Sequence, residues 1–266
     1  MTGVIVHAGY HKCATTSLQD FLQVNKDALR PYLHYYGKAD FLTAGAHARI
    51  YSQRPYLWRL WRFRRSLRTF LNHIETTETI VLSRETFSGS MPGHRKFSGA
   101  MMMGYADAAK PLSQVILSEL RRRFGKDVTV IFAYSTLEKE SWIASIHGHL
   151  LRSIRLLDDL TTFRARFPSL RAPAEEAAEM TAYLAPVQVM NIPIEEYTNH
   201  PEGPAAALLD LLSVPKSIRS SFKPAKRTNS GQNADARAQF LALNREISNK
   251  TSLKQAKSDL QHQLET

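Results

Sequence analysis

The sequence predicts an α/β fold in which a central parallel sheet is flanked by helices, and three observations lead to this prediction. Short apolar, β-branched runs recur along the chain, and they alternate with longer segments of helical periodicity. The first run, at residues 4–7, stops at Ala8-Gly9, and a helical pattern follows from Ser17. Strands separated by helices form parallel sheets through right-handed crossovers, and such sheets bind ligands beyond the carboxyl ends of their strands.

Each element follows from a local pattern. We expect strands at residues 4–7, 79–83, 128–134 and 187–191. We expect helices from Ser17, over 112–124 with Gly125 closing the helix, over 138–151 and over 234–247. Residues 89–105, with Pro, Gly and four methionines, and residues 216–233 predict irregular loops. One domain over 1–247 is expected, with acceptor-site or lid insertions within 40–110, followed by a polar helical tail over 248–266.

The composition indicates which partners the protein favours and which kinds of site and segment it lacks. Lys and Arg number 35 against 24 Asp and Glu, and the resulting formal charge of +11 favours anionic partners without choosing among them. Cys13 is the single cysteine, which excludes an intramolecular disulfide and a cysteine metal cluster. The first residues lack a charged segment followed by an apolar one, and no window approaches the roughly 20 apolar residues of a membrane span. We therefore expect a cytoplasmic protein, with peripheral contact to the inner membrane left open.

The strongest motif is the segment GYHKCATTS at residues 9–17, between the first strand and the first helix. A helix start offers unpaired backbone N–H groups and the positive end of its dipole, which together bind phosphate. Lys12 adds charge, and Thr15, Thr16 and Ser17 add hydroxyl donors. The lysine precedes the small-residue turn, so the spacing is not that of a Walker A motif. The simpler interpretation is a strand-to-helix turn with a capped helix, but a lysine and three hydroxyls exceed what such a turn needs.

The same segment, HKCATTSLQDFL, resembles the HKTGTTSLQ pattern of bacterial sulfotransferases that use 3′-phosphoadenosine 5′-phosphosulfate (PAPS). The resemblance implies a P-loop NTPase-like sulfotransferase architecture, and it implies that Lys12 neutralises charge on the bridging oxygen as the sulfuryl group leaves. Ala14 stands where the family has glycine, a change that is tolerated only if φ stays negative there. The residues that would bind the 5′-phosphosulfate are His11, Lys12, Cys13, Ala14, Thr15, Thr16 and Ser17.

Two further segments are similar to parts of the same family. The segment LSRETFS, which follows the second predicted strand, resembles the family's SSE-x-F segment and implies that Glu85 is the general base on the acceptor hydroxyl. Without the resemblance, Glu85 would be taken for a solvated loop residue. The late segment KRTNS, followed by FLALN, resembles the family's R-x-N-x-S pattern, which implies that Arg227 reaches a phosphate. A solvated basic loop is the alternative for Arg227.

The 3′-phosphate site fits the family only in part. The helix that begins near residue 138 carries WIAS, which implies that Ser145 is a 3′-phosphate ligand. At the end of the preceding strand, however, the chain has Tyr134-Ser135 where the family has arginine, and Ser135 cannot match bidentate guanidinium contacts. We expect a nearby cation, Arg152 or Arg227, to compensate.

Residues 56–68, YLWRLWRFRRSLR, form a basic and aromatic run that has no counterpart in the resemblance. The simpler interpretation is a helix that packs Leu57, Leu60, Trp61 and Leu67, with Trp58, on the core and exposes its arginines. The alternative is contact with an acidic acceptor or an anionic membrane surface.

Three functions are compared. The leading one is a sulfotransferase that moves a sulfuryl group from PAPS to a hydroxyl of a glycan or glycolipid, without a metal and without a nucleic-acid partner. A nucleotide-dependent kinase is weakened by the position of Lys12 and by the lack of a strand ending in a Walker B aspartate. A non-catalytic binding protein of the same fold is favoured by the missing strand-end arginine. His147 and His149 alternate rather than sitting at helical metal-ligand spacing, so no metal site is expected.

Overall fold

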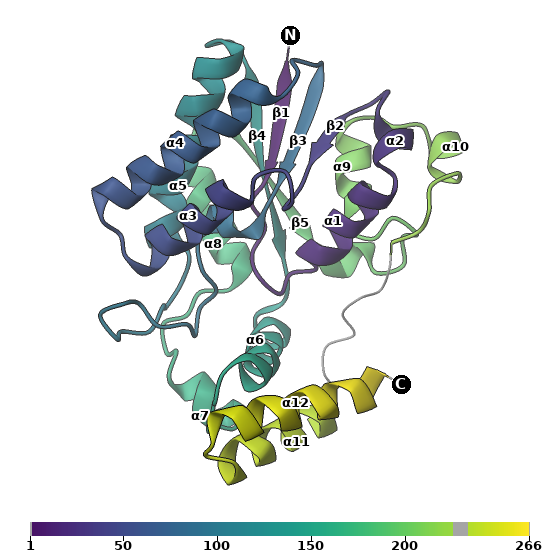
Figure 1. The fold of residues 1–266 in the computed structure, drawn as a ribbon. Coiled ribbons are helices and arrows are strands. Elements are labelled where there is room, and N and C mark those ends of the chain that lie inside the picture. The colour runs from purple at the N-terminus through teal and green to yellow at the C-terminus, as the bar shows by residue number, and fades with distance from the viewer. Residues whose placement is uncertain (1, 226–233, 266) are drawn as a thin grey trace. The chain divides into compact units, whose positions relative to one another are not determined.

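The computed structural model describes residues 2–225 and 234–265, which divide into two compact units (Figure 1). The first unit comprises Met1–Glu138 and Arg171–Thr228, and the second comprises Lys139–Leu170 and Asn229–Thr266. No helix within the described ranges is long and apolar enough to cross a membrane.

A five-stranded, all-parallel sheet forms the centre of the first unit, with the strand order β2-β3-β1-β4-β5. The strands are β1 Gly3–His7, β2 His34–Tyr36, β3 Thr79–Ser83, β4 Thr129–Thr136 and β5 Gln188–Pro193. The chain fills one half of the sheet with β2 and β3 and then crosses β1 to fill the other half. This reversal makes the carboxyl end of β1 the topological switch point, where parallel α/β sheets bind their ligands.

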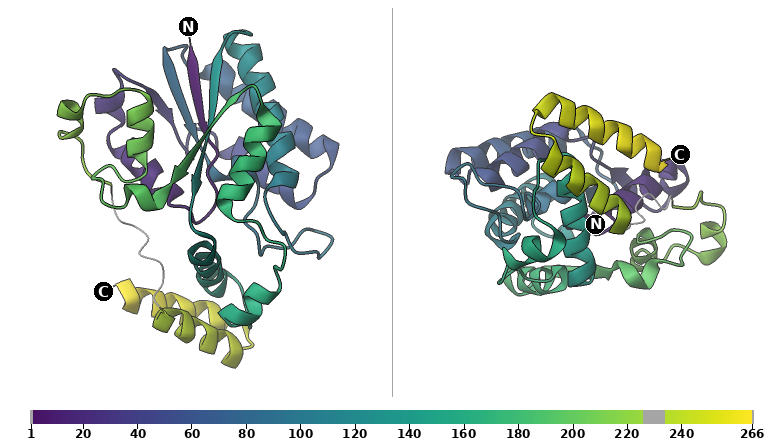
Figure 2. Two further views of the ribbon diagram at one scale, coloured as in Figure 1. Left: turned by 180° about the vertical axis from the view of Figure 1, so that it is seen from behind. Right: turned by 90° about the horizontal axis from the view of Figure 1, so that it is seen from below.

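Helices cover both faces of this sheet (Figure 2). On one face, Ile5, Val81 and Ala133 pack against α1 and α9 in a continuous apolar core. The alternate strand residues, such as Val6 and Phe132, are equally buried and point to the face that carries α4, α5 and α8. Burial on both faces explains why the central strands β1 and β3 contain apolar runs rather than alternating patterns.

Some helix ends of the first unit coincide with local sequence signals. Helix α5, for example, ends at Gly125, which has φ 98° and donates its N–H to the Arg121 carbonyl. The α-helices are α1 Thr15–Val24, α2 Lys26–Leu29, α3 Leu42–Gln53, α4 Leu57–His73, α5 Ala106–Phe124, α8 Pro173–Leu184, α9 Ala205–Leu211 and α10 Lys216–Arg219, and the 3₁₀ turns are η1 Glu85–Ser88 and η2 Ile194–Tyr197.

The second unit is built from helices alone among its described residues. They are α6 Lys139–Ser153, α7 Leu160–Ala165, α11 Ala234–Glu246 and α12 Lys250–Glu265. Asn244 on α11 donates its side-chain amide to the Leu151 carbonyl of α6 at 3.0 Å, and Arg155 donates to the Asn244 carbonyl at 3.0 Å. Buried side chain-to-backbone bonds of this kind fix α11 against the end of α6.

The predicted fold class is confirmed as α/β with a parallel sheet flanked by helices. The four predicted strands and the predicted helices are all present, and residues 89–105 form an irregular segment, with a single isolated bridge between Arg95 and Met101. The sequence analysis did not predict β2, α2, α3, α7, α8 and α9. Of the loop predicted over 216–233, the first residues form α10, and residues 226–233 lie outside the described part of the chain.

Candidate functional site

The carboxyl ends of the three central strands are joined by one buried histidine. His7, the last residue of β1, is 0% exposed and places its ring between two serine hydroxyls. Nδ1 lies 2.7 Å from Ser83 Oγ on β3, and Nε2 lies 2.8 Å from Ser135 Oγ on β4. Burial lowers the pKa of His7 from 6.5 to about 4, although Glu85 opposes the shift. The neutral ring donates to one serine and accepts from the other, and these two bonds connect the carboxyl ends of β1, β3 and β4.

The loop between β1 and α1 lies directly on this histidine. A Cβ on Gly9 would stand 2.7 Å from His7 Nε2 and 2.8 Å from Thr15 Cγ2, so only glycine allows the loop to approach this closely. The side chains of Tyr10 and Cys13 are both 0% exposed and anchor the loop from below. The Tyr10 ring stacks on Tyr134 with 5.2 Å between centroids. The loop is therefore held rigidly at the carboxyl end of β1.

Two non-glycine residues of the loop have left-handed backbones. Lys12 has φ 69° and Ala14 has φ 50°. The condition set for alanine at this position, a negative φ, is not met, because Ala14 takes the conformation that favours glycine. For other residues this conformation costs on the order of 1–3 kcal/mol. At Ala14 the loop therefore follows a backbone path that glycine adopts more easily than alanine.

Replacing Ala14 by glycine is expected to raise the free energy of unfolding by about 1 kcal/mol, because relief of left-handed strain exceeds the entropy that glycine adds to the unfolded chain. Urea unfolding monitored by circular dichroism measures this change. The matched control is Ala172→Gly, since Ala172 has φ −64° at the start of α8 and its replacement should not stabilise the protein. A loss of stability in Ala14→Gly comparable to that of the control would contradict the strained geometry.

Helix α1 begins at the end of this loop, and its N-cap residue provides no side-chain cap. Its N-cap, Ala14, makes no side-chain hydrogen bond, and the first turn of α1 contains no acidic residue. Thr16 is exposed and Ser17 half-buried, whereas Thr15 is buried. The first N–H groups and the positive end of the helix dipole thus have no anionic side chain from their own turn, an arrangement that suits a bound anion.

Glu85 lies beside the loop, at the start of η1 and directly after β3. Gln19 on α1 donates its Nε2 to Glu85 Oε2 at 3.1 Å. Burial tends to raise the pKa of Glu85, but His11, the residue's own backbone N–H, Gln19 and Arg84 together lower it below its usual value. The carboxylate is therefore ionised at neutral pH, which is the form that accepts a proton.

His11 links the loop to Glu85 and to the segment before α5. Its backbone N–H donates to the Tyr105 hydroxyl at 3.1 Å, and that hydroxyl lies 3.4 Å from His11 Nδ1. Burial lowers the pKa of His11 to about 4; Glu85 raises it, while His94, Lys12 and Arg49 lower it further. The charges of Glu85 and Lys12 both act on this ring, so the structure brings the predicted residues His11, Lys12 and Glu85 into one electrostatic neighbourhood.

The remaining predicted site residues lie beneath the loop, in the second unit or outside the described residues. The Ser135 hydroxyl is 0% exposed and bonded to His7, so it lies beneath the loop rather than on its surface. Ser145 lies on α6 in the second unit, as does the predicted compensating cation Arg152. Arg227, the other predicted phosphate contact, lies outside the described residues.

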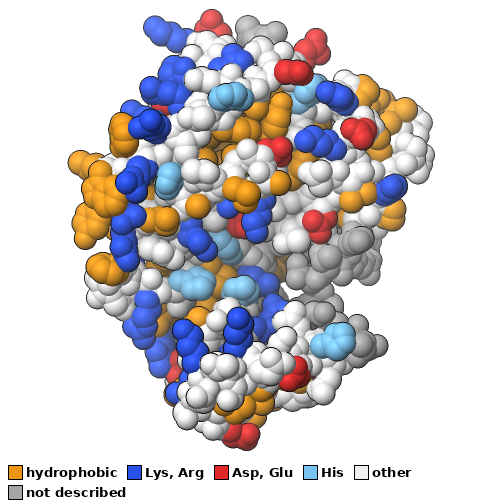
Figure 3. Space-filling view, in the orientation of Figure 1, with side chains coloured by type: hydrophobic (Ala, Val, Ile, Leu, Met, Phe, Trp, Pro, Cys, Tyr) orange, Lys and Arg blue, Asp and Glu red, His pale blue; other side chains and the backbone are white. Residues whose placement is uncertain are grey.

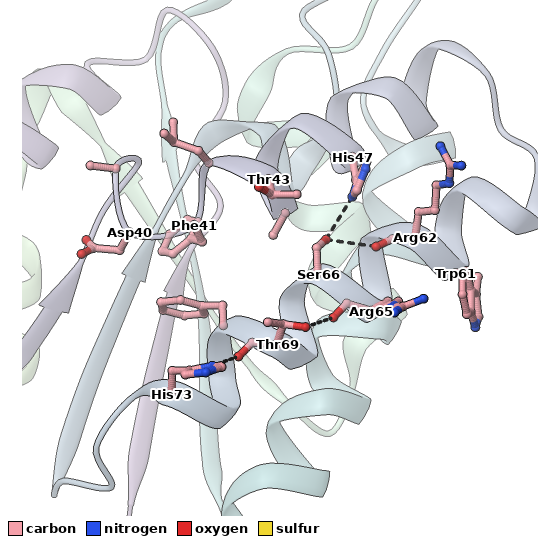
Figure 4. Close-up of a pocket in the computed structure, with 14 residues that line it drawn as sticks. Asp40, Phe41, Thr43, His47, Trp61, Arg62, Arg65, Ser66, Thr69 and His73 are labelled. Carbon is pink, nitrogen blue, oxygen red and sulfur yellow. Dashed lines mark hydrogen bonds between the residues drawn. The ribbon is translucent and has the colours of Figure 1, made fainter.

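A cavity of about 780 Å³ lies between α3 and α4, within residues 40–110, where the acceptor site was predicted (Figure 4). His47 Nδ1 lies 3.1 Å from Ser66 Oγ in its wall, and Arg62 and Arg65 supply positive charge. Phe41, which also lines the cavity, stacks on Phe87 of η1 with 5.3 Å between centroids. One aromatic contact therefore connects the cavity wall to the turn that carries Glu85.

The sequence analysis missed four residues of this site: His7, Gln19, Arg84 and Tyr105. Arg84 is 6% exposed, and its guanidinium donates to Thr86 Oγ1 and to the Lys38 carbonyl, both at 2.9 Å. A histidine that ends an apolar strand was the one signal for His7, because a polar ring there must find buried partners. Gln19 faces Glu85 only through the packing of α1, which no local pattern reveals.

Comparison with known proteins gives no assignment. No protein-family model matches the chain, and no curated protein matches its sequence. Among the described residues, no group of three or more His, Cys, Asp or Glu side chains is placed to hold a metal ion.

Proposed function

We propose that this protein is a PAPS-dependent sulfotransferase of P-loop NTPase-like architecture, which transfers a sulfuryl group to a hydroxyl of a glycan or glycolipid. The observation that carries the proposal is the loop of residues 9–14. It lies at the switch point of the sheet, follows a left-handed path at Lys12 and Ala14, and leads into a helix whose N-cap residue provides no side-chain cap. Together with the resemblance of HKCATTSLQDFL to the family's pattern, this geometry supports binding of a nucleotide phosphate.

The residues around the loop could stabilise the leaving phosphate and remove the proton of the acceptor hydroxyl, which are the two requirements of sulfuryl transfer. The bound nucleotide supplies an activated sulfuryl group. The N–H groups at the start of α1 and the charge of Lys12 stabilise negative charge that develops on the departing phosphate oxygen. Glu85, ionised and held by Gln19, accepts the proton of the acceptor hydroxyl as that oxygen attacks sulfur. Catalysis then rests on positioning and electrostatic stabilisation, as in phosphoryl transfer.

The cavity between α3 and α4 is the best-supported acceptor site. Its wall contains aromatic rings, hydroxyls and two histidines, which suit the apolar faces and hydroxyl groups of a sugar. Its contact with Phe87 of η1 relates it to Glu85 through a single aromatic stack.

Calorimetric titration with 3′-phosphoadenosine 5′-phosphate tests the nucleotide site. We expect binding that depends on the 3′-phosphate, with AMP and ATP binding at least ten-fold more weakly, and we expect Lys12→Ala to weaken binding at least ten-fold because a phosphate loses its cation. Lys126→Ala, an exposed lysine in the turn before β4, is the matched control and should bind as the unaltered protein does. Equal affinity in Lys12→Ala would contradict the role given to Lys12.

A second candidate function is binding of an anionic ligand without catalysis. The strand-end position that holds arginine in the family is Ser135 here, and its hydroxyl is taken up by His7. If the 3′-phosphate makes no difference to nucleotide affinity, this second function is favoured over the transferase.

A further inference from the structure

We propose that the first two turns of α4 bind the surface of an anionic lipid bilayer. The proposal does not depend on the transferase function, although Trp61, Arg62 and Arg65 also line the cavity between α3 and α4. It rests on the side chains that α4 leaves outside the core, which we call the α4 face: Tyr56, Leu57, Trp58, Arg59, Trp61, Arg62 and Arg65.

The simpler interpretation of this helix, that its aromatic stripe packs on the core, is wrong for its amino-terminal half. The core is contacted by Phe63, Leu67 and Leu71, which recur every four residues and are each 0% exposed. By contrast, Leu57 is 83% exposed and Trp61 is 57% exposed. Helix α4 therefore has two apolar faces, one buried and one open to solvent.

The exposed face combines aromatic rings with arginines that have no carboxylate partner among the described residues. Arg59 lies 4.1 Å from the centroid of the Trp58 ring, and Arg65 lies 5.6 Å from that of Trp61. The arginines on the flank of α4 behave differently, since Arg64 and Arg68 both pair with Glu119 of α5. Helix α4 has no acidic residue. No carboxylate in the described part of the chain therefore neutralises the arginines of the α4 face.

Arg54 and Phe97, which lie near the start of α4, add a further arginine and a further exposed aromatic ring to this surface. Phe97 is 69% exposed, and the Arg54 guanidinium lies 3.7 Å above its ring. The Phe97 N–H donates to the Gln53 carbonyl at the end of α3, which holds this ring near the start of α4. In Figure 3 the hydrophobic and basic side chains lie next to one another along the edge where α4 begins.

An anionic bilayer surface is the occupant that this chemistry fits. Exposed Trp and Tyr partition to the boundary between headgroups and acyl chains, and arginines near them attract lipid phosphates. A second copy of the chain fits poorly, because a twofold contact would bring the same unpaired arginines together.

Vesicle sedimentation tests the proposal on the full chain. We expect the protein to bind phosphatidylcholine vesicles that contain phosphatidylglycerol and not vesicles of phosphatidylcholine alone. The Trp58→Ala, Trp61→Ala variant should bind at least ten-fold more weakly, because it loses the inserted aromatic area. The Arg59→Gln, Arg62→Gln, Arg65→Gln variant should bind on the order of 100-fold more weakly, since each arginine near an anionic surface contributes about 1 kcal/mol.

The matched control removes the same charge elsewhere: Arg121→Gln, Lys126→Gln, Lys216→Gln, all exposed positions outside the α4 face. If the control loses as much binding as the arginine variant, net charge alone explains the effect and the proposal is overturned. If the tryptophan variant binds like the unaltered protein, contact through α4 is likewise overturned. A dimer in size-exclusion chromatography that dissociates in the tryptophan variant, without vesicle binding, would assign the face to self-association instead.

Tryptophan fluorescence provides an independent readout. The chain has three tryptophans, and Trp142 is 0% exposed, so a change in fluorescence on binding reports Trp58 and Trp61. We expect a blue shift with anionic vesicles and none with neutral ones. Circular dichroism spectra and melting curves that match the unaltered protein confirm that each variant is folded.

Discussion

Glu85→Gln is expected to lower turnover at least 100-fold while leaving the affinity for 3′-phosphoadenosine 5′-phosphate unchanged. A positioned general base contributes on the order of 10²- to 10⁴-fold to rate, and glutamine cannot accept the proton. Glutamine nevertheless keeps the shape of the side chain and an oxygen that can accept the hydrogen bond from Gln19. The change should therefore appear in kcat and not in nucleotide binding, as expected for an interaction made in the transition state.

The measurement is the rate at which 3′-phosphoadenosine 5′-phosphate forms from PAPS in the presence of a panel of glycan and glycolipid acceptors. Glu78→Gln is the matched control, because this exposed glutamate lies at the opposite end of β3 from Glu85. The control should keep full turnover. A Glu85→Gln variant as active as the control would remove Glu85 from the reaction. If the unaltered protein binds the nucleotide but turns over no acceptor, the non-catalytic function is favoured.

The centre of the sheet could be predicted from the sequence because β1 and β3 are buried on both faces. Residues 4–6 and 80–82 are continuous apolar runs, which is the pattern that two-sided burial favours. β2 escaped prediction because His34–Tyr36 is only three residues long, too short for any period to be recognised. Its place at the edge of the sheet is set by pairing with β3, which is a tertiary interaction.

Some helices were missed for a related reason. α3 has weak amphipathic character, and it packs through small residues: a Cβ on Gly45 would stand 1.7 Å from Arg84 Nε. Helix α9 is buried along most of its length, so its sequence AAALLDL shows little alternation of polar and apolar residues. In both cases the identity of the packing partner, rather than a local pattern, determines the structure.

The features of the candidate site also divide into those that the sequence could predict and those that depend on tertiary packing. The loop at residues 9–17 could be found because a lysine and three hydroxyls at a strand-to-helix junction have a direct chemical meaning. The left-handed backbone at Ala14 could not, because alanine favours negative φ and only tertiary packing holds it otherwise. The role of Ser135 was equally hidden, since its hydroxyl bonds His7, 128 residues earlier in the chain.

The protein is expected to lose stability as the pH falls from about 6.5 to about 4, and His7 should cause a large part of this loss. Unfolded, His7 takes up a proton below pH 6.5, whereas in the native state burial holds its pKa at about 4. Because the unfolded chain binds more protons across this window, the free energy of unfolding falls with pH there, and His7 contributes no further loss below about pH 4. The shift corresponds to roughly 3 kcal/mol.

His7→Gln isolates this contribution. Glutamine has a donor and an acceptor for Ser83 and Ser135 but does not titrate, so the variant should be less stable than the unaltered protein at pH 7 by about 1–2 kcal/mol. That difference should shrink or reverse by pH 4. Urea unfolding at a series of pH values measures both proteins, and subtracting the two curves removes the contribution of the other histidines. His200→Gln, at an exposed position, is the control for replacing a histidine by glutamine. Parallel curves for His7→Gln and the unaltered protein would mean that the ring between the serines carries a proton in the native state, and the neutral bridge beneath the loop would then be wrong.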